Sequence, residues 1–127
     1  MNAPVLVIED DQDTCATIEQ VLLADNITSQ YVQTRDDALL LLDKGVRPSC
    51  ILVDYMMPGT SLTEFIYILQ ALGLASARIV LTTASSDIED VAKRLGIRYT
   101  LRKPILPDEL IRVVKSAIES GEHAAVP

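Results

Sequence analysis

Five short aliphatic runs alternate along the chain with segments whose apolar residues recur at helical spacing. The aliphatic runs lie at residues 4–9, 27–32, 50–54, 78–83 and 98–102. The helical segments lie at residues 12–24, 34–43, 61–72, 86–95 and 107–120. This alternation predicts βαβ units, whose right-handed crossovers place helices on both faces of a parallel sheet. The sequence therefore predicts an α/β protein with an open, doubly wound parallel sheet of the (βα)5 type.

Local signals support this order of elements. The run "CILVD" at 50–54 is the most continuously apolar, which favours a central strand, whereas residues 27–32 alternate as a half-buried edge strand does. Thr34 is placed to cap the helix that follows it. Ser61 and Ser86 each begin a Ser-x-x-Glu capping box, so a helix is expected to open at each of them.

The length of 127 residues fits one domain with one hydrophobic core. We expect that domain to cover residues 1–120 and residues 121–127 to form a flexible tail, because the end of the chain, "SGEHAAVP" at 120–127, has little to bury. No apolar run approaches the length that spans a bilayer, and the first residues lack the features of a signal peptide. We therefore expect a cytoplasmic protein with no membrane partner.

Charge and cysteine content exclude two classes of function. The net charge of −7 argues against direct binding to nucleic acid, which depends on Lys and Arg neutralising phosphates. Cys15 and Cys50 are far apart in the sequence and are expected to be buried free thiols. With His123 as the single histidine, the chain offers no zinc site.

Polar residues follow four of the five expected strands. They are Glu9, Asp10 and Asp11 after the first, Asp54 after the third, Thr82 and Thr83 at the end of the fourth, and Lys103 after the fifth. Each one alone has an ordinary explanation as a solvated loop residue or a helix cap. Together they point to a site, because ligands of such sheets bind beyond the carboxyl ends of the strands.

The residue types at these ends suit phosphoryl transfer. Neighbouring carboxylates repel one another unless cations join them, and Lys103 and Mg²⁺ meet that need with hard oxygen ligands. Asp54 beside Mg²⁺ can attack phosphorus and form an aspartyl phosphate. The metal and the lysine would offset the charge on the phosphoryl oxygens, and Thr83 could donate a hydrogen bond to one of them.

With these residues in place, the chain resembles the receiver domains of two-component response regulators. Four motifs carry the resemblance in order, "VIEDD", "LVDYMMPG", "LTTA" and "RKP", and it covers residues 4–120. It implies a flavodoxin-like fold with strand order 2-1-3-4-5. It also implies roles: Glu9 and Asp10 for Mg²⁺, Asp54 as phosphoacceptor and further metal ligand, Met56 through its backbone carbonyl, Thr83 as switch hydroxyl, and Lys103 followed by a cis peptide to Pro104.

The chain departs from the family pattern at two positions. Receivers commonly carry an aromatic residue three positions before the lysine, where this chain has Thr100, with Tyr99 one residue earlier. Strand alternation turns Tyr99 to the opposite face. Either a local bulge or a shortened connection restores the aromatic residue to that face or, as we favour, the protein signals without it. The family usually has glycine eight residues after the phosphoacceptor, where this chain has Leu62, so the loop there is expected to differ in shape.

The resemblance implies partners and leaves alternatives. Asp54 would accept the phosphoryl group of a phosphohistidine on a sensor histidine kinase or phosphotransfer protein, and the domain would then signal to an unidentified protein rather than act as an enzyme.

Tyr67 and Ile68 occupy positions expected to face solvent, so they form either an ordinary apolar surface or a self-association face. A degenerate receiver that acts as a constitutive interaction module stays open. A Mg²⁺-dependent aspartyl phosphatase is disfavoured because Met56 stands where its general acid would be. The sequence does not decide between a stand-alone protein and a piece of a longer chain.

Overall fold

A computed structural model of the chain describes residues 3–74 and 78–124, with side chains through residue 121. The described residues form one parallel sheet in the order β2-β1-β3-β4-β5. The strands are β1 (Val5–Ile8), β2 (Ser29–Val32), β3 (Ile51–Asp54), β4 (Ile79–Thr83) and β5 (Tyr99–Arg102). The helices are α1 (Gln12–Ala24), α2 (Arg35–Asp43), α3 (Leu62–Ala71), α4 (Ile88–Leu95) and α5 (Pro107–Ala124). The predicted fold class and strand order are confirmed.

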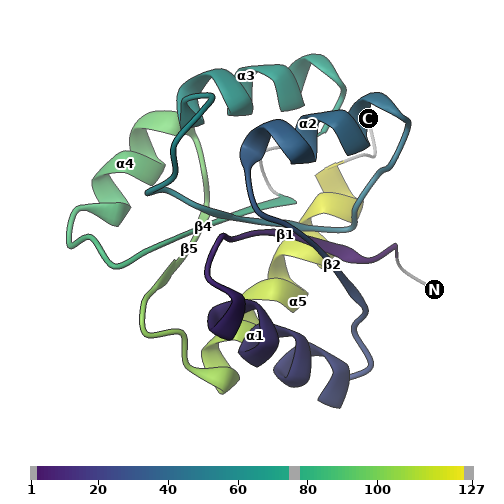
Figure 1. Cartoon of the computed structure of the whole chain (residues 1–127), viewed down its shortest axis with the longest axis vertical. Coiled ribbons are helices and arrows are strands. Elements are labelled where there is room, and N and C mark those ends of the chain that lie inside the picture. Colours follow the sequence, from purple (N-terminus) through teal and green to yellow (C-terminus); the bar gives the residue numbers. More distant parts are fainter. Residues whose placement is uncertain (1–2, 75–77, 125–127) are drawn as a thin grey trace.

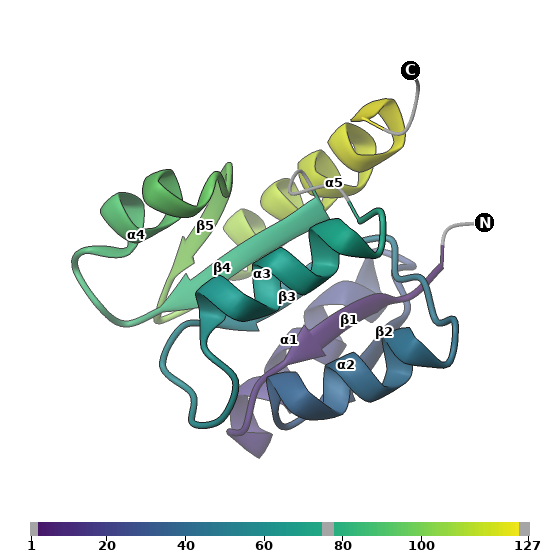
Figure 2. The same cartoon turned by 90° about the horizontal axis from the view of Figure 1, so that it is seen from above.

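Helices cover both faces of the sheet, as Figures 1 and 2 show. Helices α1 and α5 lie on one face, and α2, α3 and α4 lie on the other. Alternation along the strands divides the apolar side chains between the two layers. In β1, for example, Val5 and Val7 pack with the α1 and α5 side, whereas Leu6 and Ile8 pack with the α2 and α3 side. Strand β3 lies in the middle and β2 lies at an edge, as expected.

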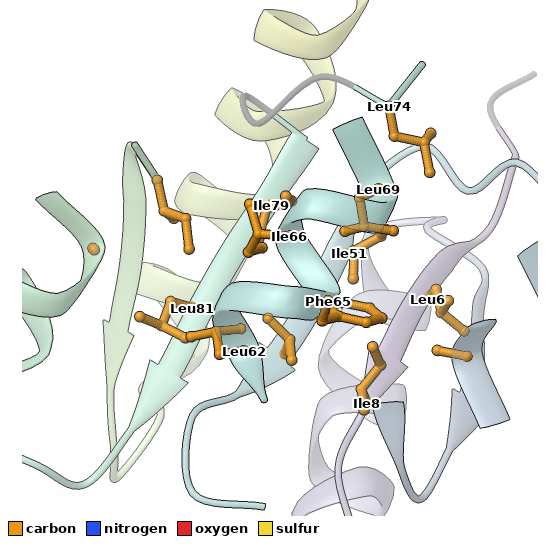
Figure 3. Close-up of a cluster of buried hydrophobic side chains, with 14 of the residues drawn as sticks. Leu6, Ile8, Ile51, Leu62, Phe65, Ile66, Leu69, Leu74, Ile79 and Leu81 are labelled. Carbon is orange, nitrogen blue, oxygen red and sulfur yellow. The ribbon is translucent and has the colours of Figure 1, made fainter. Parts of the chain in front are cut away.

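The core under α3 is centred on Phe65, which is fully buried (Figure 3). Leu62 and Leu69 come from the same helix and enter the same cluster. Burying a side chain of this size stabilises a fold by about 1.5–3 kcal/mol. Leu62, which stands at the family's glycine position, is therefore a core residue at the first position of α3 and is only 5% exposed.

Two of the three expected helix caps are confirmed. Thr34 caps α2 by accepting a hydrogen bond from the Asp37 amide, and Ser61 caps α3 by accepting one from the Glu64 amide. The predicted cap at Ser86 is wrong. Helix α4 begins at Ile88, and Asp87 before it makes no side-chain cap bond, because the Asp87 carboxylate instead accepts a hydrogen bond from the Ser85 hydroxyl.

Helix α5 continues to Ala124, so the tail expected from residue 121 begins inside a helix. Gly121 is buried there, and its carbonyl accepts a hydrogen bond from Arg78 Nη2 at 3.3 Å. This contact explains the longer helix, since the arginine directly precedes β4 and links the last turns of α5 to the beginning of that strand. Residues 125–127 of the expected tail lie outside the described residues.

The pairing of β4 with β5 is regular, with Val80 opposite Tyr99 and Leu81 opposite Thr100. No bulge therefore restores the family's aromatic residue. Tyr99 packs on the α5 side, where its hydroxyl pairs with Ser120 Oγ at 2.5 Å, and Thr100 is half-buried on the opposite face. The face that carries the aromatic residue in the family carries a threonine here.

Candidate phosphorylation site

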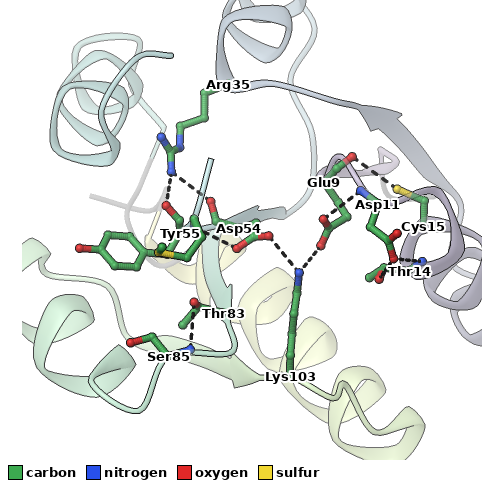
Figure 4. Close-up of polar contacts among 11 residues, drawn as sticks. Glu9, Asp11, Thr14, Cys15, Arg35, Asp54, Tyr55, Thr83, Ser85 and Lys103 are labelled. Carbon is green, nitrogen blue, oxygen red and sulfur yellow. Dashed lines mark hydrogen bonds and ion pairs between the residues drawn. The ribbon is translucent and has the colours of Figure 1, made fainter. Parts of the chain in front are cut away.

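The polar residues expected at the strand ends meet at the carboxyl ends of the parallel strands. Glu9 directly follows β1, Asp54 ends β3, Thr83 ends β4, and Lys103 directly follows β5. All of these strands are parallel, so their carboxyl ends lie on the same side of the sheet, across the strand direction. Figure 4 shows the side chains of Glu9, Asp54 and Lys103 pointing toward one another.

Lys103 joins the two buried carboxylates. Its Nζ donates to Glu9 Oε1 at 2.6 Å and to Asp54 Oδ2 at 2.9 Å (Figure 4). The Glu9 and Asp54 side chains are only 3% and 7% exposed, and the Lys103 side chain is 24% exposed. Its backbone is held as well, because the Lys103 amide donates to the Thr83 carbonyl, and the peptide bond to Pro104 is cis as the family resemblance implied.

The pKa values reflect this contact. Burial raises the pKa of Glu9, and the hydrogen bond from Lys103 offsets only part of that effect. Burial acts to lower the pKa of Lys103, but its hydrogen bonds to Glu9 and Asp54 outweigh burial, and the net pKa is raised. The lysine therefore stays charged at neutral pH, where it can stabilise negative charge at Asp54.

The three consecutive acids after β1 have different surroundings. Glu9, Asp10 and Asp54 bring one carboxylate oxygen each within 4.8 Å of one another, with Asp10 exposed at the surface. Asp11 instead caps α1 by accepting from the Thr14 amide and hydroxyl, and these hydrogen bonds lower its pKa. The negative charge of the carboxylates of Glu9, Asp10 and Asp54 exceeds what the single positive charge of Lys103 can offset. Hard oxygen ligands with one open side are the kind that Mg²⁺ prefers.

Met56 and Thr83 border Asp54. The Met56 amide donates to Asp54 Oδ1 at 3.1 Å, while its side chain is 67% exposed. Thr83 is fully buried, and its Oγ1 accepts from the Ser85 amide at 3.2 Å. Thr82, the residue directly opposite Asp54 in the sheet, is an ordinary buried strand residue.

The two cysteines are free, and they differ in burial. Cys50 is fully buried, as expected, and burial raises its pKa to about 12. Cys15 is only half-buried, and its thiol contacts the Glu9 carbonyl at 3.6 Å. The expectation of two buried thiols is therefore correct for Cys50 only.

One residue of this site was not foreseen from the sequence. Arg35, the first residue of α2, is 2% exposed and donates to backbone carbonyls at and beyond Asp54. A weak signal was present, because an arginine in the first turn of a helix opposes the helix dipole. Nothing in the local pattern indicated what the arginine would contact.

Comparison with protein families places the chain in a class of signalling domains. Residues 5–115 match the family described as response regulator receiver domain. The chain belongs to this family, whose members serve in two-component signalling.

Curated relatives agree with this assignment. The chain is 27% identical over 124 residues to the DNA-binding response regulator MtrA of Mycolicibacterium smegmatis, covering 96% of this chain and 53% of that protein. It is 33% identical over 121 residues to the hydrogenase transcriptional regulatory protein HoxA of Cupriavidus necator, covering 93% of this chain and 24% of that protein. The chain thus spans about half the length of the MtrA relatives it matches, and less of HoxA.

Solved structures show the same fold. A Francisella response regulator receiver domain superposes with a TM-score of 0.79 at 24% identity, over 94% of this chain and 98% of that one. A chemotaxis response regulator of Vibrio cholerae superposes with a TM-score of 0.77 at 20% identity, over 92% of this chain and 99% of that one. Within residues 3–74 and 78–124, no helix combines the length and the apolar character needed to cross a membrane.

Proposed function

We propose that this domain accepts a phosphoryl group on Asp54 from a phosphohistidine, in a Mg²⁺-dependent reaction in the cytoplasm. The observation that carries the proposal is the contact of Lys103 Nζ with both Asp54 Oδ2 and Glu9 Oε1, at the edge where Asp10 adds a third carboxylate. The donor would be a sensor histidine kinase or a phosphotransfer protein. The transfer forms a bond from an Asp54 oxygen to phosphorus and breaks the P–N bond, and the leaving imidazole takes up a proton.

Each residue has a definable part in this reaction. Glu9, Asp10 and the Met56 carbonyl would hold Mg²⁺ together with Asp54, and the ion when bound offsets the charge of the phosphoryl oxygens. Lys103 would keep one hydrogen bond to Glu9 and direct another to the phosphoryl group. Thr83 accepts a hydrogen bond from the Ser85 amide, which leaves its own proton free to donate to a phosphoryl oxygen.

The output of the domain would be a contact with another protein. The phosphoryl group carries a charge of about −1.5 to −2, in place of the single negative charge of the free Asp54 carboxylate, and this change biases the loops around the site between two arrangements. Some relatives are named as DNA-binding, but they are longer than this chain, and its net charge of −7 disfavours direct contact with nucleic acid. Tyr67 is 73% exposed and Ile68 is half-buried, so self-association through this side of α3 stays a prediction.

Mass spectrometry after incubation with acetyl phosphate and Mg²⁺ tests the proposal. We expect one added phosphoryl group on the wild type and none on Asp54→Asn or in the presence of EDTA. An unmodified wild type, or a modification that persists in Asp54→Asn, would refute the mechanism. A wild type that also fails to bind Mg²⁺ with beryllofluoride would indicate a degenerate receiver instead.

A further inference from the structure

The guanidinium of Arg35 binds the backbone on both sides of the loop that follows the phosphoacceptor. Nη2 donates to the Asp54 carbonyl at 3.1 Å and to the Tyr55 carbonyl at 2.7 Å (Figure 4), and Nη1 donates to the Thr60 carbonyl at 2.7 Å. The loop between β3 and α3 therefore has its beginning and its end attached to one side chain. That side chain comes from a different element, α2.

This placement is costly for an arginine. The residue is 2% exposed, and no carboxylate in the part of the chain that the structure describes lies within ion-pair distance of it. Burial lowers the pKa of Arg35, and the charge of Asp54 offsets that effect only in part. The positive charge also sits at the positive end of the α2 dipole. A buried charge in such a position is retained only where its hydrogen bonds compensate, so the three carbonyls are what hold it.

A second contact from α2 reinforces the attachment. Asp36, the next residue, accepts a hydrogen bond from the Thr60 hydroxyl. Gly59 has φ of +95° and passes so close to Asp36 that a Cβ there would lie 3.0 Å from Asp36 Oδ2. The start of α2 thus determines the path of the loop at Gly59 and Thr60, and Arg35 determines it at Asp54 and Tyr55.

The loop held in this way carries the group expected to complete the metal site. Met56 lies between the attached ends, donates its amide to Asp54 Oδ1, and carries the carbonyl that the proposed function assigns to Mg²⁺. The Met57 amide donates to the Tyr55 carbonyl, which Arg35 also binds. Without the guanidinium, the Asp54 and Tyr55 carbonyls would lose their common donor, Arg35 Nη2. The Met56 peptide would then be free to sample other orientations.

We propose that Arg35 is a positioning residue of the phosphorylation site, which holds the loop from Tyr55 to Thr60 in the arrangement in which the Met56 carbonyl would bind Mg²⁺. This role rests on the function proposed above. Arg35 donates to the backbone carbonyls of Asp54, Tyr55 and Thr60, and it is not among the groups assigned to the metal or to the phosphoryl group. Groups that orient metal ligands from behind contribute about 10- to 100-fold in metal affinity or activity.

The experiment compares Arg35→Met with Arg35→Lys and with Arg78→Met as a matched control. Arg78 also donates to three backbone carbonyls, those of Pro48, Ser49 and Gly121, but it directly precedes β4 and so lies at the amino-terminal ends of the strands, opposite the ends that carry Asp54. Removing it should lower stability without affecting the loop after Asp54. Each protein is titrated with Mg²⁺ by calorimetry, and phosphorylation by acetyl phosphate is timed at low and at saturating Mg²⁺.

For Arg35→Met we expect the Mg²⁺ affinity to fall about 10- to 100-fold, with most of the phosphorylation rate recovered at saturating Mg²⁺. The Mg²⁺ affinity of Arg35→Lys should lie between those of the wild type and Arg35→Met, because one ammonium cannot reproduce the geometry of the two guanidinium nitrogens that donate to the loop. Arg78→Met should keep the wild-type affinity. In metal-free protein, the Met56 and Met57 amides should exchange with solvent at least about tenfold faster in Arg35→Met than in Arg78→Met.

Wild-type Mg²⁺ affinity and wild-type exchange at Met56 and Met57 in a folded Arg35→Met protein would overturn the inference and leave the proposed function standing. If Arg35→Met does not fold, an unchanged affinity in Arg35→Lys overturns it. A wild type that neither binds Mg²⁺ nor accepts a phosphoryl group would overturn the proposed function itself, together with the positioning role that rests on it.

Discussion

Replacing Lys103 with methionine tests the electrostatics of the site most directly. The change keeps most of the aliphatic stem and removes the ammonium that joins Glu9 and Asp54. Two carboxylates that are almost fully buried are then left side by side without a cation. Free energy of unfolding should fall, because each charge was stabilised in the fold by the lysine.

Breaking a buried ion pair by removing one partner typically costs about 3–5 kcal/mol. Since the Lys103 side chain is 24% exposed, solvent screens part of the interaction, and we expect the lower end, about 3 kcal/mol. With an m-value of about 1–3 kcal/mol per molar urea, this corresponds to a fall of at least about 1 M in the unfolding midpoint.

The loss of stability in Lys103→Met should depend on pH, and the pKa of Glu9 determines whether it is larger at high or at low pH. Its pKa in the folded protein is already raised by burial, so the folded state binds a proton more tightly than the unfolded state does. Stability linked to Glu9 therefore increases as the pH falls through its folded pKa, until the unfolded value of 4.5 is passed. Removing the ammonium raises this pKa further, and each additional unit is worth about 1.4 kcal/mol. Lys103→Met should lose more stability at pH 8 than at pH 5.

Urea unfolding followed by circular dichroism, with EDTA present at both pH values, measures the effect. Lys115→Met is the matched control, because Lys115 pairs with Asp25 at 2.6 Å but the two side chains are 58% and 37% exposed. Exposed pairs are worth about 0–1 kcal/mol, so this variant should change little at either pH. If Lys103→Met lost no more than Lys115→Met, or lost the same amount at pH 5 and pH 8, the electrostatic description of the site would be wrong.

Three further predictions concern the metal, the last helix and β5. Mg²⁺ at a hundredfold excess over its dissociation constant should stabilise the wild type by about 2.7 kcal/mol, and Asp10→Asn should remove most of this gain in thermal unfolding; an equal gain in both proteins would exclude Asp10 as a ligand. Gly121→Ala should destabilise the fold by about 1–3 kcal/mol, because the new Cβ would lie 2.4 Å from Arg78 Cγ. Helix propensity alone predicts the opposite, so a rise in melting temperature would contradict that contact. Tyr99→Phe should cost about 1 kcal/mol in urea unfolding and leave phosphorylation by acetyl phosphate unchanged, since its hydroxyl bonds to α5; a slower phosphorylation would place Tyr99 in the switch after all.

Much of the fold could be predicted because its signals are local. A strand or a helix shows its period within a few residues, and the caps at Thr34 and Ser61 act over three. The errors arose where a local signal met a competing contact. Ser86 has the form of a cap, but the hydrogen bonds of the turn at Ser85 delay the start of α4. The last helix extends beyond residue 120, where its apolar helical spacing ends, because Arg78 donates a hydrogen bond to the Gly121 carbonyl.

The gathering of Glu9, Asp54 and Lys103 could be predicted because parallel strands deliver their carboxyl ends to one edge, whatever the detailed path of the loops. Their distances could not, because side-chain orientation depends on the turns that follow the strands. The acids after β1 illustrate this: three consecutive residues look alike in the sequence, yet the turn directs Glu9 to Lys103 and leaves Asp11 to cap α1.

The sequence by itself determined the class of fold, the strand ends that carry charge and the family. Each of these depends on periodicity or on the residue type at a fixed position. Only the tertiary structure decided that Tyr99 faces α5 and that Arg35 reaches carbonyls 19 to 25 residues away. Contacts at such separations depend on how separate elements pack around a shared core, and no pattern within either element specifies the other.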